Sequence, residues 1–292
     1  MANNVTKTAA DVHIPDVFVQ GVIAALEAQT TIQNDVDRSW DFVGSGDTYR
    51  KARFPNLTVA AKAENTPLTP QYYTDTEQTI NINTYVASAV AIEKNVNILA
   101  QNDLRSEFMK KMGYAMARKI DTDLAGLAGS FPQVVGTYGV EATFETLLSA
   151  IALAAAANYD PTDGFVFYVS APQYYALIKD DRFSNANYVG QGNAEGANRK
   201  GMVGMCAGVP VKMSNLLTVP AAGQHDNFLL KDECVALIMA MEPEFTTEVR
   251  ALDLDEVIVM SEIYGYSQVT RYRETPGDTT ATNEGCVLVR GV

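Results

Sequence analysis

The sequence is poor in the residues that carry most enzyme chemistry. Its 292 residues include two histidines, His13 and His225, and three cysteines. The cysteines, Cys206, Cys234 and Cys286, are far apart and odd in number, and no Cys-x-x-Cys spacing occurs. A zinc site or a redox motif needs such spacing, so we expect neither. We interpret the thiols as small buried hydrophobic groups and the histidines as surface residues.

Nucleotide-binding and nucleophile motifs are missing as well. The glycines at 201, 204 and 208 do not form Gly-x-Gly-x-x-Gly, and no Lys-Ser/Thr pair follows them. The Gly-Ser-Gly triplet at 44–46 lacks the spacing of a nucleophile elbow. The acidic run at 253–256 offers the oxygen ligands that Ca²⁺ prefers, but we interpret it as a solvated turn between strands. We therefore expect no enzyme activity, no cofactor and no metal.

No apolar run reaches the length of about 18 residues that suggests a membrane span. The longest run, 151–157, is rich in alanine and ends at Asn158. The first eight residues lack the basic and then apolar layout of a signal peptide. We therefore expect no membrane contact. We also expect the protein to be made and used in a cytoplasm.

Positive charge is scarce. Lys and Arg number 22 and Asp and Glu number 35, so the net charge at pH 7 is −13. Binding to nucleic-acid phosphates relies on clustered Lys and Arg, and this balance argues against it. The same charge fits a container whose acidic inner wall repels packed DNA. The hydrophobic share of 47% is that of a globular chain.

We predict that the N-terminal region forms a polar arm over 1–14, followed by a short helix. Pro15 suits a first helical position, and the apolar residues after it recur at helical spacing up to about Gln29. The apolar face consists of Phe18, Val22, Ala25 and Leu26.

The segment 48–62 is basic within an acidic chain and holds no acidic residue. Residues 79–86 then alternate between polar and apolar, which is typical of a strand. We predict a long β-hairpin over 47–88 with too little apolar content for a core of its own. It packs on its own body or on another subunit, and an acidic neighbour would complement its charge. The basic residues are Arg50, Lys51, Arg53 and Lys62.

Two pairs of tyrosines have the aromatic faces that can stack on bases. In an acidic chain we interpret them as packing and interface residues instead. The pairs are Tyr72 with Tyr73, in the hairpin, and Tyr264 with Tyr266.

The segment 98–130 has the pattern of one long helix. An apolar residue recurs every four positions, and such a stripe winds slowly around the helix. A helix of about 30 residues would be about 45 Å long, more than a compact core needs, so we expect a structural spine. The stripe consists of Leu104, Phe108, Met112, Met116, Ile120 and Leu124.

The following segments alternate between helix and strand, which predicts a small mixed α/β unit. We expect helices at 144–157 and 171–180, an interior strand at 164–169 and a polar loop at 181–200. The glycine-rich run 201–215 predicts a compact β-turn-β unit. Further strands are predicted at 227–230, 235–239, 245–250, 257–273 and 286–290.

In this order the segments resemble the Hong Kong 97-type fold of the major capsid proteins of tailed bacteriophages, which encapsulin shells share. The likeness is carried by 165–180 with 201–215, by the long helix followed by the alanine-rich helix, and by 14–18 leading to 36–40. The implied fold class is α+β. The implied parts are an N-terminal arm and short helix (1–46), an extended loop (47–88), a peripheral domain with the spine helix (89–133), an axial domain (134–241) and return strands of the peripheral domain (242–292).

The resemblance implies a subunit that assembles with itself, through hexamers and pentamers, into an icosahedral shell around double-stranded DNA. Assembly in the host cytoplasm would involve a separate scaffolding protein and a portal, with a decoration protein as an open alternative. The extended loop would lie across the adjacent subunit. The implied assembly residues are Arg50, Lys51, Arg53, Lys62, Tyr72 and Tyr73.

Two other functions stay open at this point. An encapsulin-like compartment has the same fold but holds a cargo enzyme. An α/β enzyme with a β-ribbon dimerisation arm would form a small, defined oligomer with a ligand pocket.

Overall fold

The computed structural model of the chain describes residues 4–5, 32–39, 46–53, 57, 59, 61–65, 67–68, 70, 72, 76–99, 104–161, 163–180, 204–272 and 281–292. The predicted helix at 15–29 and the predicted loop at 181–200 lie outside the described residues.

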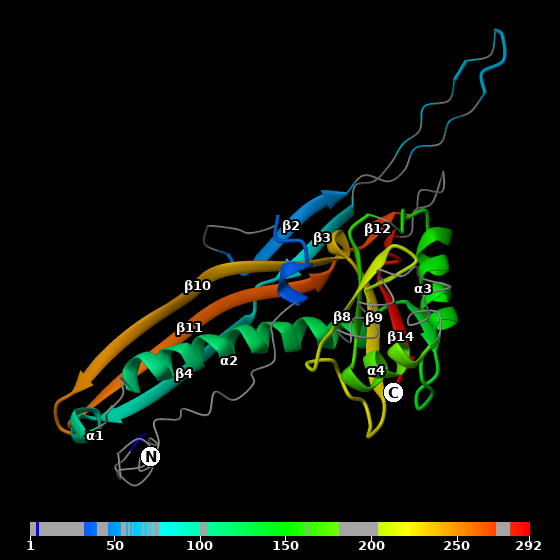
Figure 1. The fold of residues 1–292 in the computed structure, drawn as a ribbon. Helices are drawn as coiled ribbons and strands as arrows, with labels where there is room; N and C mark the ends of the chain where they lie inside the picture. The colour runs from blue at the N-terminus through cyan, green and yellow to red at the C-terminus, as the bar shows by residue number, and fades with distance from the viewer. Residues whose placement is uncertain are drawn as a thin grey trace.

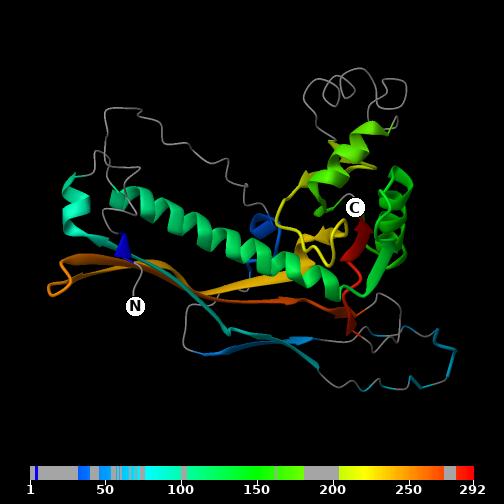
Figure 2. The ribbon, with the colours of Figure 1, turned by 90° about the horizontal axis from the view of Figure 1, so that it is seen from below.

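The described residues form two main sheets side by side, one long and narrow and one short and wide (Figure 1). Two further sheets have two strands each: one pairs β2 (Thr48–Arg53) with β3 (Thr76–Asn81), and the other pairs β12 (Arg271–Tyr272) with β13 (Ala281–Thr282). The long sheet has four strands in the order β1-β4-β11-β10. Its neighbours β4, β11 and β10 are antiparallel, whereas β1 pairs with β4 in parallel. Helix α2 lies along one face of this sheet (Figure 2). The bounds are β1 Asn4–Val5, β4 Thr84–Glu93, β11 Asp255–Gln268, β10 Val235–Arg250 and α2 Leu104–Gly126.

The apolar stripe of α2 is confirmed, because its residues face the long sheet. Met112 and Met116 pack in one cluster with Met260 of β11, while Ile120 and Leu124 pack in another with Tyr264. The predicted length was wrong: α2 has 23 residues, which corresponds to about 35 Å. A separate helix, α1 (Lys94–Leu99), follows β4, and a 3-10 helix, η3 (Leu127–Ser130), ends α2.

The strand predictions for the long sheet need two corrections. Residues 235–239 and 245–250 are not separate strands but belong to one strand, β10, with bulges near Met241. The alternation at 79–86 is confirmed, yet the chain leaves strand geometry at 82–83, where it passes from the hairpin into the long sheet.

The second sheet has six strands in the order β5-β14-β9-β6-β8-β7. Strand β6 is buried along its whole length because α3 covers one face of the sheet, while the core shared with α2 covers the other. Helices α3 (Phe144–Ala156) and α4 (Ala171–Lys179) form where the sequence predicts them. The strands are β5 Gln133–Gly136, β6 Phe165–Val169, β7 Met205–Cys206, β8 Val209–Met213, β9 His225–Lys231 and β14 Val287–Gly291.

The predicted β-turn-β unit is the hairpin of β7 and β8. Its turn residues Ala207 and Gly208 both have positive φ, as the tight turns that suit antiparallel strands require. The return segment 242–292 divides between the sheets: β11 lies in the long sheet, whereas β14 lies between β5 and β9 in the six-stranded one.

Among the described residues, three parts of the chain lie between the two main sheets and meet at one place, which we call the junction. They are η3 with Phe131 and Pro132, the 3-10 helix η4 (Asp232–Cys234), and the two described ends, 269–272 and 281–286, of the connection from β11 to β14. The side-chain amide of Gln268 donates to Ser130 Oγ at 2.6 Å, and that of Asn283 donates to the Cys234 carbonyl at 3.1 Å and to Gln268 Oε1 at 3.2 Å. The amides of Gln268 and Asn283 thus connect all three parts.

Glu262 is a buried carboxyl on the helix-facing side of β11. It lies between Met260 and Tyr264, two positions from each, and is 1% exposed. Neither carboxylate oxygen has a hydrogen-bond partner among the described residues. Burial raises the pKa of Glu262, because the charged form loses its hydration. Nearby, Tyr264 donates its hydroxyl proton to Asp123 Oδ2 at 2.7 Å, and Lys119 pairs with Asp123 at 2.5 Å.

We predict that Glu262 makes the fold less stable as the pH rises. The unfolded chain loses the Glu262 proton in the usual glutamate range, while the folded chain keeps it to higher pH. Stability therefore falls between these two pKa values, by about 1.4 kcal/mol per pH unit, and is level above the folded pKa. Glu262→Gln does not titrate, so the difference in unfolding free energy between wild type and variant should show this slope. A difference that is constant from pH 4 to 8 in urea unfolding would contradict the prediction.

Candidate assembly interface

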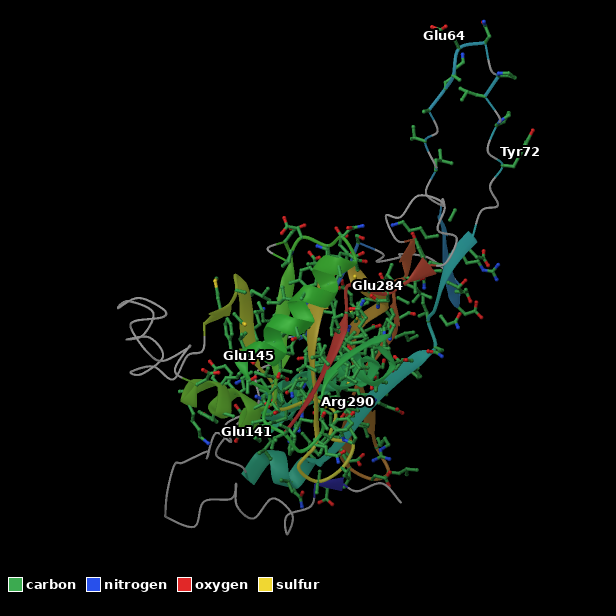
Figure 3. The ribbon with its side chains drawn as sticks, turned by 90° about the vertical axis from the view of Figure 1, so that its right-hand side faces the viewer. Glu64, Tyr72, Glu141, Glu145, Glu284 and Arg290 are labelled. Atoms are coloured by element: carbon green, nitrogen blue, oxygen red, sulfur yellow. The ribbon has the colours of Figure 1, made fainter. Side chains whose placement is uncertain are left out.

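The predicted basic hairpin exists and leaves the body of the molecule. Its strands β2 (Thr48–Arg53) and β3 (Thr76–Asn81) are antiparallel, with Thr48 opposite Asn81 and Arg53 opposite Thr76. Beyond them the described tip residues lie far from both sheets, as Glu64 and Tyr72 do in Figure 3.

The root of the hairpin packs on its own body. Ile80 and Ile82 are buried against Ala236 and Ile238 of β10 and against Val269. These residues form a small core on the face of the long sheet opposite α2. The two alternatives from the sequence therefore divide along the hairpin: its root packs on its own body, and its tip does not.

Polar contacts hold the same root at the junction. The Gln78 side chain donates to the Gln268 carbonyl at 3.2 Å and accepts from the Thr270 hydroxyl at 3.1 Å. Beside it the backbone of the hairpin crosses β11 at Gly265. A Cβ at Gly265 would lie 2.5 Å from the Asn81 carbonyl oxygen, which is closer than real Cβ atoms approach. Only glycine allows this crossing.

The six candidate residues all lie on this hairpin segment, at two distances from the body. Arg50 and Lys51 are exposed on β2 near the root, whereas Lys62 and Tyr72 are exposed on the distal part, Tyr72 to 93%. Arg53 ends β2, and its side chain is not described; Tyr73 lies outside the described residues. Their role in assembly stays a prediction.

The hairpin is less uniformly basic than its outgoing strand. Arg50 Nη1 lies 3.4 Å from Glu77 Oε1 on β3, and both side chains are more than half exposed. An exposed pair of this kind contributes little to stability, about 0 to 1 kcal/mol. Its geometry leaves both groups accessible to a charged partner.

A second surface, which sequence reasoning missed, is the outer edge of β10. Residues 242–249 are exposed on both faces of the strand, and no described strand pairs with this edge. An exposed strand edge of this length is a site for pairing with another chain. The signal in the sequence was three glutamates within 242–248, two just before the predicted strand 245–250 and one inside it. The exposed acidic residues are Glu242, Glu244 and Glu248, and the exposed apolar ones include Phe245 and Val249.

The acidic run at 253–256 needs a correction. Asp255 is not solvated but buried, and the Arg250 side chain donates to it from both Nε, at 2.9 Å, and Nη2. This pair fastens the β10–β11 turn, which carries the exposed Leu252 and Leu254. No group of three or more metal-ligating side chains occurs among the described residues.

Other predictions about single residues are confirmed where the structure describes them. The three cysteines are buried and free, Tyr264 is buried, and Tyr266 packs against the main core. His225 begins β9 and is partly exposed, whereas His13 lies outside the described residues. Within the described part of the chain, no helix is long and apolar enough to cross a membrane.

One pocket of about 640 Å³ lies where the segment 34–38 meets the six-stranded sheet. Its charged groups are engaged within the chain. Lys212 Nζ lies 2.5 Å from Asp35 Oδ2, and the Tyr168 hydroxyl donates to the same carboxylate. These contacts fix the N-terminal segment on the sheet, which is a structural role.

No protein-family model matches the chain, and no curated protein matches its sequence. Solved structures do match. The chain is similar to one from the capsid of cyanophage P-SCSP1u, with a TM-score of 0.75, 17% identity and coverage of 99% of this chain and 96% of that one. A chain from the acid-stable capsid structure of Helicobacter pylori bacteriophage KHP30 matches with a TM-score of 0.71, 13% identity and coverage of 99% of this chain and 98% of that one. A chain from the mature capsid of bacteriophage PhiM1 matches with a TM-score of 0.70, 13% identity and coverage of 97% of this chain and 98% of that one.

These matches extend over nearly the full length of both chains. Identities this low show the fold and leave open what the chain does. The protein is therefore a mixed α and β chain with the fold of phage capsid proteins.

We predict that Gly265→Ala loosens the root of the hairpin. The new Cβ would meet the Asn81 carbonyl and the Ile82 backbone, and such overpacking costs about 1 to 3 kcal/mol. Thermal unfolding should show the loss, and hydrogen exchange should speed up in 48–53 and 76–82. Gly126→Ala is the matched control, because a Cβ there meets nothing within 4 Å and alanine favours a helix. Equal exchange rates in the hairpins of both variants would contradict the prediction.

Proposed function

We propose that this chain is the major capsid protein of a tailed bacteriophage. It assembles with itself through hexamers and pentamers into an icosahedral shell that encloses double-stranded DNA. The observation that carries the proposal is the full-length likeness in fold to chains of phage capsids. The proposal assigns no catalytic step to the chain: its work is association.

The Hong Kong 97-type parts follow from this assignment. Helix α2 is the spine helix of a peripheral domain, together with the long sheet. The six-stranded sheet with α3 and α4 is the axial domain, which meets its copies around the five-fold and six-fold axes. It takes most of the expected range 134–241, but residues 235–241 belong to β10 of the long sheet, and β14 joins the axial domain from the return segment. Residues 47–88 are the extended loop, and 1–46 are the N-terminal arm. The described parts of this arm contact their own chain, because β1 pairs with β4 and Asp35 pairs with Lys212, so any contact with a neighbouring subunit would involve other parts of it.

The two exposed surfaces described above suggest how copies meet. The side chains of Arg50 and Lys51 on β2 are positively charged. The carboxylates on the outer edge of β10 are negatively charged; they belong to Glu242, Glu244 and Glu248. In the proposed contact the hairpin of one copy lies along the β10 edge of the next. Such exposed charges set orientation and register more than affinity. Each contact can be weak because a closed symmetric shell repeats it many times.

The net charge supports the enclosing role. At −13 the subunit would give the shell an acidic wall that repels the DNA phosphates, so the genome is held without sequence-specific binding. The expected partners are a separate scaffolding protein and a portal, with a decoration protein as an open alternative. Assembly takes place in the host cytoplasm, and the mature protein is in the virion.

Negative-stain microscopy of the purified chain, alone and co-expressed with its genomic neighbours, tests the proposal. Closed shells, tubes or sheets of hexamers support it. Shells that copurify with a cargo enzyme would point to an encapsulin-like compartment instead. A small, monodisperse oligomer under every condition, with a melting shift on adding a ligand, would favour an enzyme and overturn the proposal.

We predict that reversing the charges of β2 stops assembly without unfolding the subunit. The variant is Arg50→Glu, Lys51→Glu and Arg53→Glu, which places like charges against the β10 edge. Particle yield measured by sedimentation should fall at least tenfold, while the circular dichroism of the subunit stays that of the wild type. The control Arg50→Lys, Lys51→Arg and Arg53→Lys keeps the charges and should assemble.

A charge exchange identifies the partner surface. Glu242→Lys, Glu244→Lys and Glu248→Lys should also block assembly, and combining both sets in one chain should restore particles. Normal shells from the β2 variant would refute the role of the hairpin. If each set of substitutions blocks assembly and the combined variant also fails to assemble, the hairpin contacts a surface other than the β10 edge.

A further inference from the structure

Two of the three cysteines lie together at the junction. Cys234 ends η4, between β9 and β10, and Cys286 immediately precedes β14. Both are fully buried in the same core cluster. A Cβ on Gly285 would lie 2.3 Å from Cys234 Sγ, so this sulfur rests against the backbone next to Cys286. The third cysteine, Cys206, is buried in a different cluster.

The two thiols are not equivalent. The neighbouring Cys286 side chain lowers the pKa of Cys234 and burial raises it, but the Tyr159 hydroxyl, 4.0 Å from Cys234 Sγ, also lowers it, so the pKa lies below its ordinary value. Burial and the neighbouring sulfur raise the pKa of Cys286, and burial raises the pKa of Cys206 to about 12. A thiolate is the reactive form of cysteine. The pair therefore holds one sulfur that ionises more readily and one that keeps its proton.

We propose that Cys234 and Cys286 form a disulfide within the folded chain when it meets a peroxide, and that this bond locks the junction. The bond goes beyond the proposed capsid function and does not depend on it. Cys286 and Cys234 belong to two different parts of the junction, so the bond would join the entry of β10 to the entry of β14. Motion between the two sheets would then have to deform a covalent link.

The chemistry balances with hydrogen peroxide as the oxidant. The Cys234 thiolate attacks one peroxide oxygen, the O–O bond breaks, and Cys234 becomes a sulfenic acid as hydroxide leaves. The Cys286 sulfur then attacks the Cys234 sulfur, the S–O bond breaks, and the departing hydroxyl takes up the Cys286 proton as water. Two thiols and one peroxide yield one disulfide and two waters, counting the proton that Cys234 first released. The two sulfurs must approach each other to about 2.05 Å for the bond to form.

Peptide mapping of the intact chain tests the bond. The folded protein is treated with hydrogen peroxide well below its melting temperature, quenched, denatured and alkylated, and its peptides are separated without reductant. We expect one linked pair, containing Cys234 and Cys286 and lighter by two hydrogens, and an alkylated Cys206. Three alkylated cysteines, a stable oxidised Cys234 without a link, or a link to Cys206 would each overturn the proposal.

Thermal unfolding tests the lock. A disulfide typically stabilises a domain enough to raise Tm by roughly 5 to 10 °C. The oxidised wild type and the matched control Cys206→Ser should both show this rise, and dithiothreitol should reverse it. The variant Cys286→Ser should show no rise in Tm when its melting temperatures before and after oxidation are compared. An oxidised, linked wild type whose Tm does not rise would refute the lock.

Discussion

The junction between the two sheets is the constraint on which the other parts of the structure depend. Three described parts of the chain meet there, and the amides of Gln268 and Asn283 connect them. The root of the hairpin reaches the same place through Gln78. The orientation of the long sheet, of the six-stranded sheet and of the hairpin is therefore set by one small group of polar contacts, which range from buried to exposed. Where such a network is buried, it favours a single arrangement because breaking one member leaves the others unsatisfied.

The hairpin shows how one segment can be part of a core and still be free to bind. Near the junction it contributes Ile80 and Ile82 to a small apolar cluster and crosses β11 over Gly265. Farther out its residues have no such support, and Tyr72 is nearly fully exposed. A partner gains most from a segment whose base is fixed, because less freedom is lost on binding.

The sequence predicted best what depends on local periodicity. The stripe of α2, the alternation around Ile80 and Ile82 and the β7–β8 turn were readable because each pattern repeats within a few residues. It predicted poorly what depends on partners distant along the chain. The break at 82–83, the single strand β10 and the burial of Asp255 follow from which strand lies alongside. The exposed edge of β10, the unpaired Glu262 and the neighbouring thiols of Cys234 and Cys286 could be seen only after the two sheets were placed.

The long sheet meets the junction at one end only (Figure 1). With α2 along its length it is a stiff arm of about 35 Å pivoted at its base. By simple geometry, turning this arm by about 5° moves its far end, at the β10–β11 turn, by about 3 Å. A small rotation at the base of the arm is thus converted at its far end into a displacement of about the length of a hydrogen bond. Subunits that touch at such tips could alter their spacing while their cores stay unchanged.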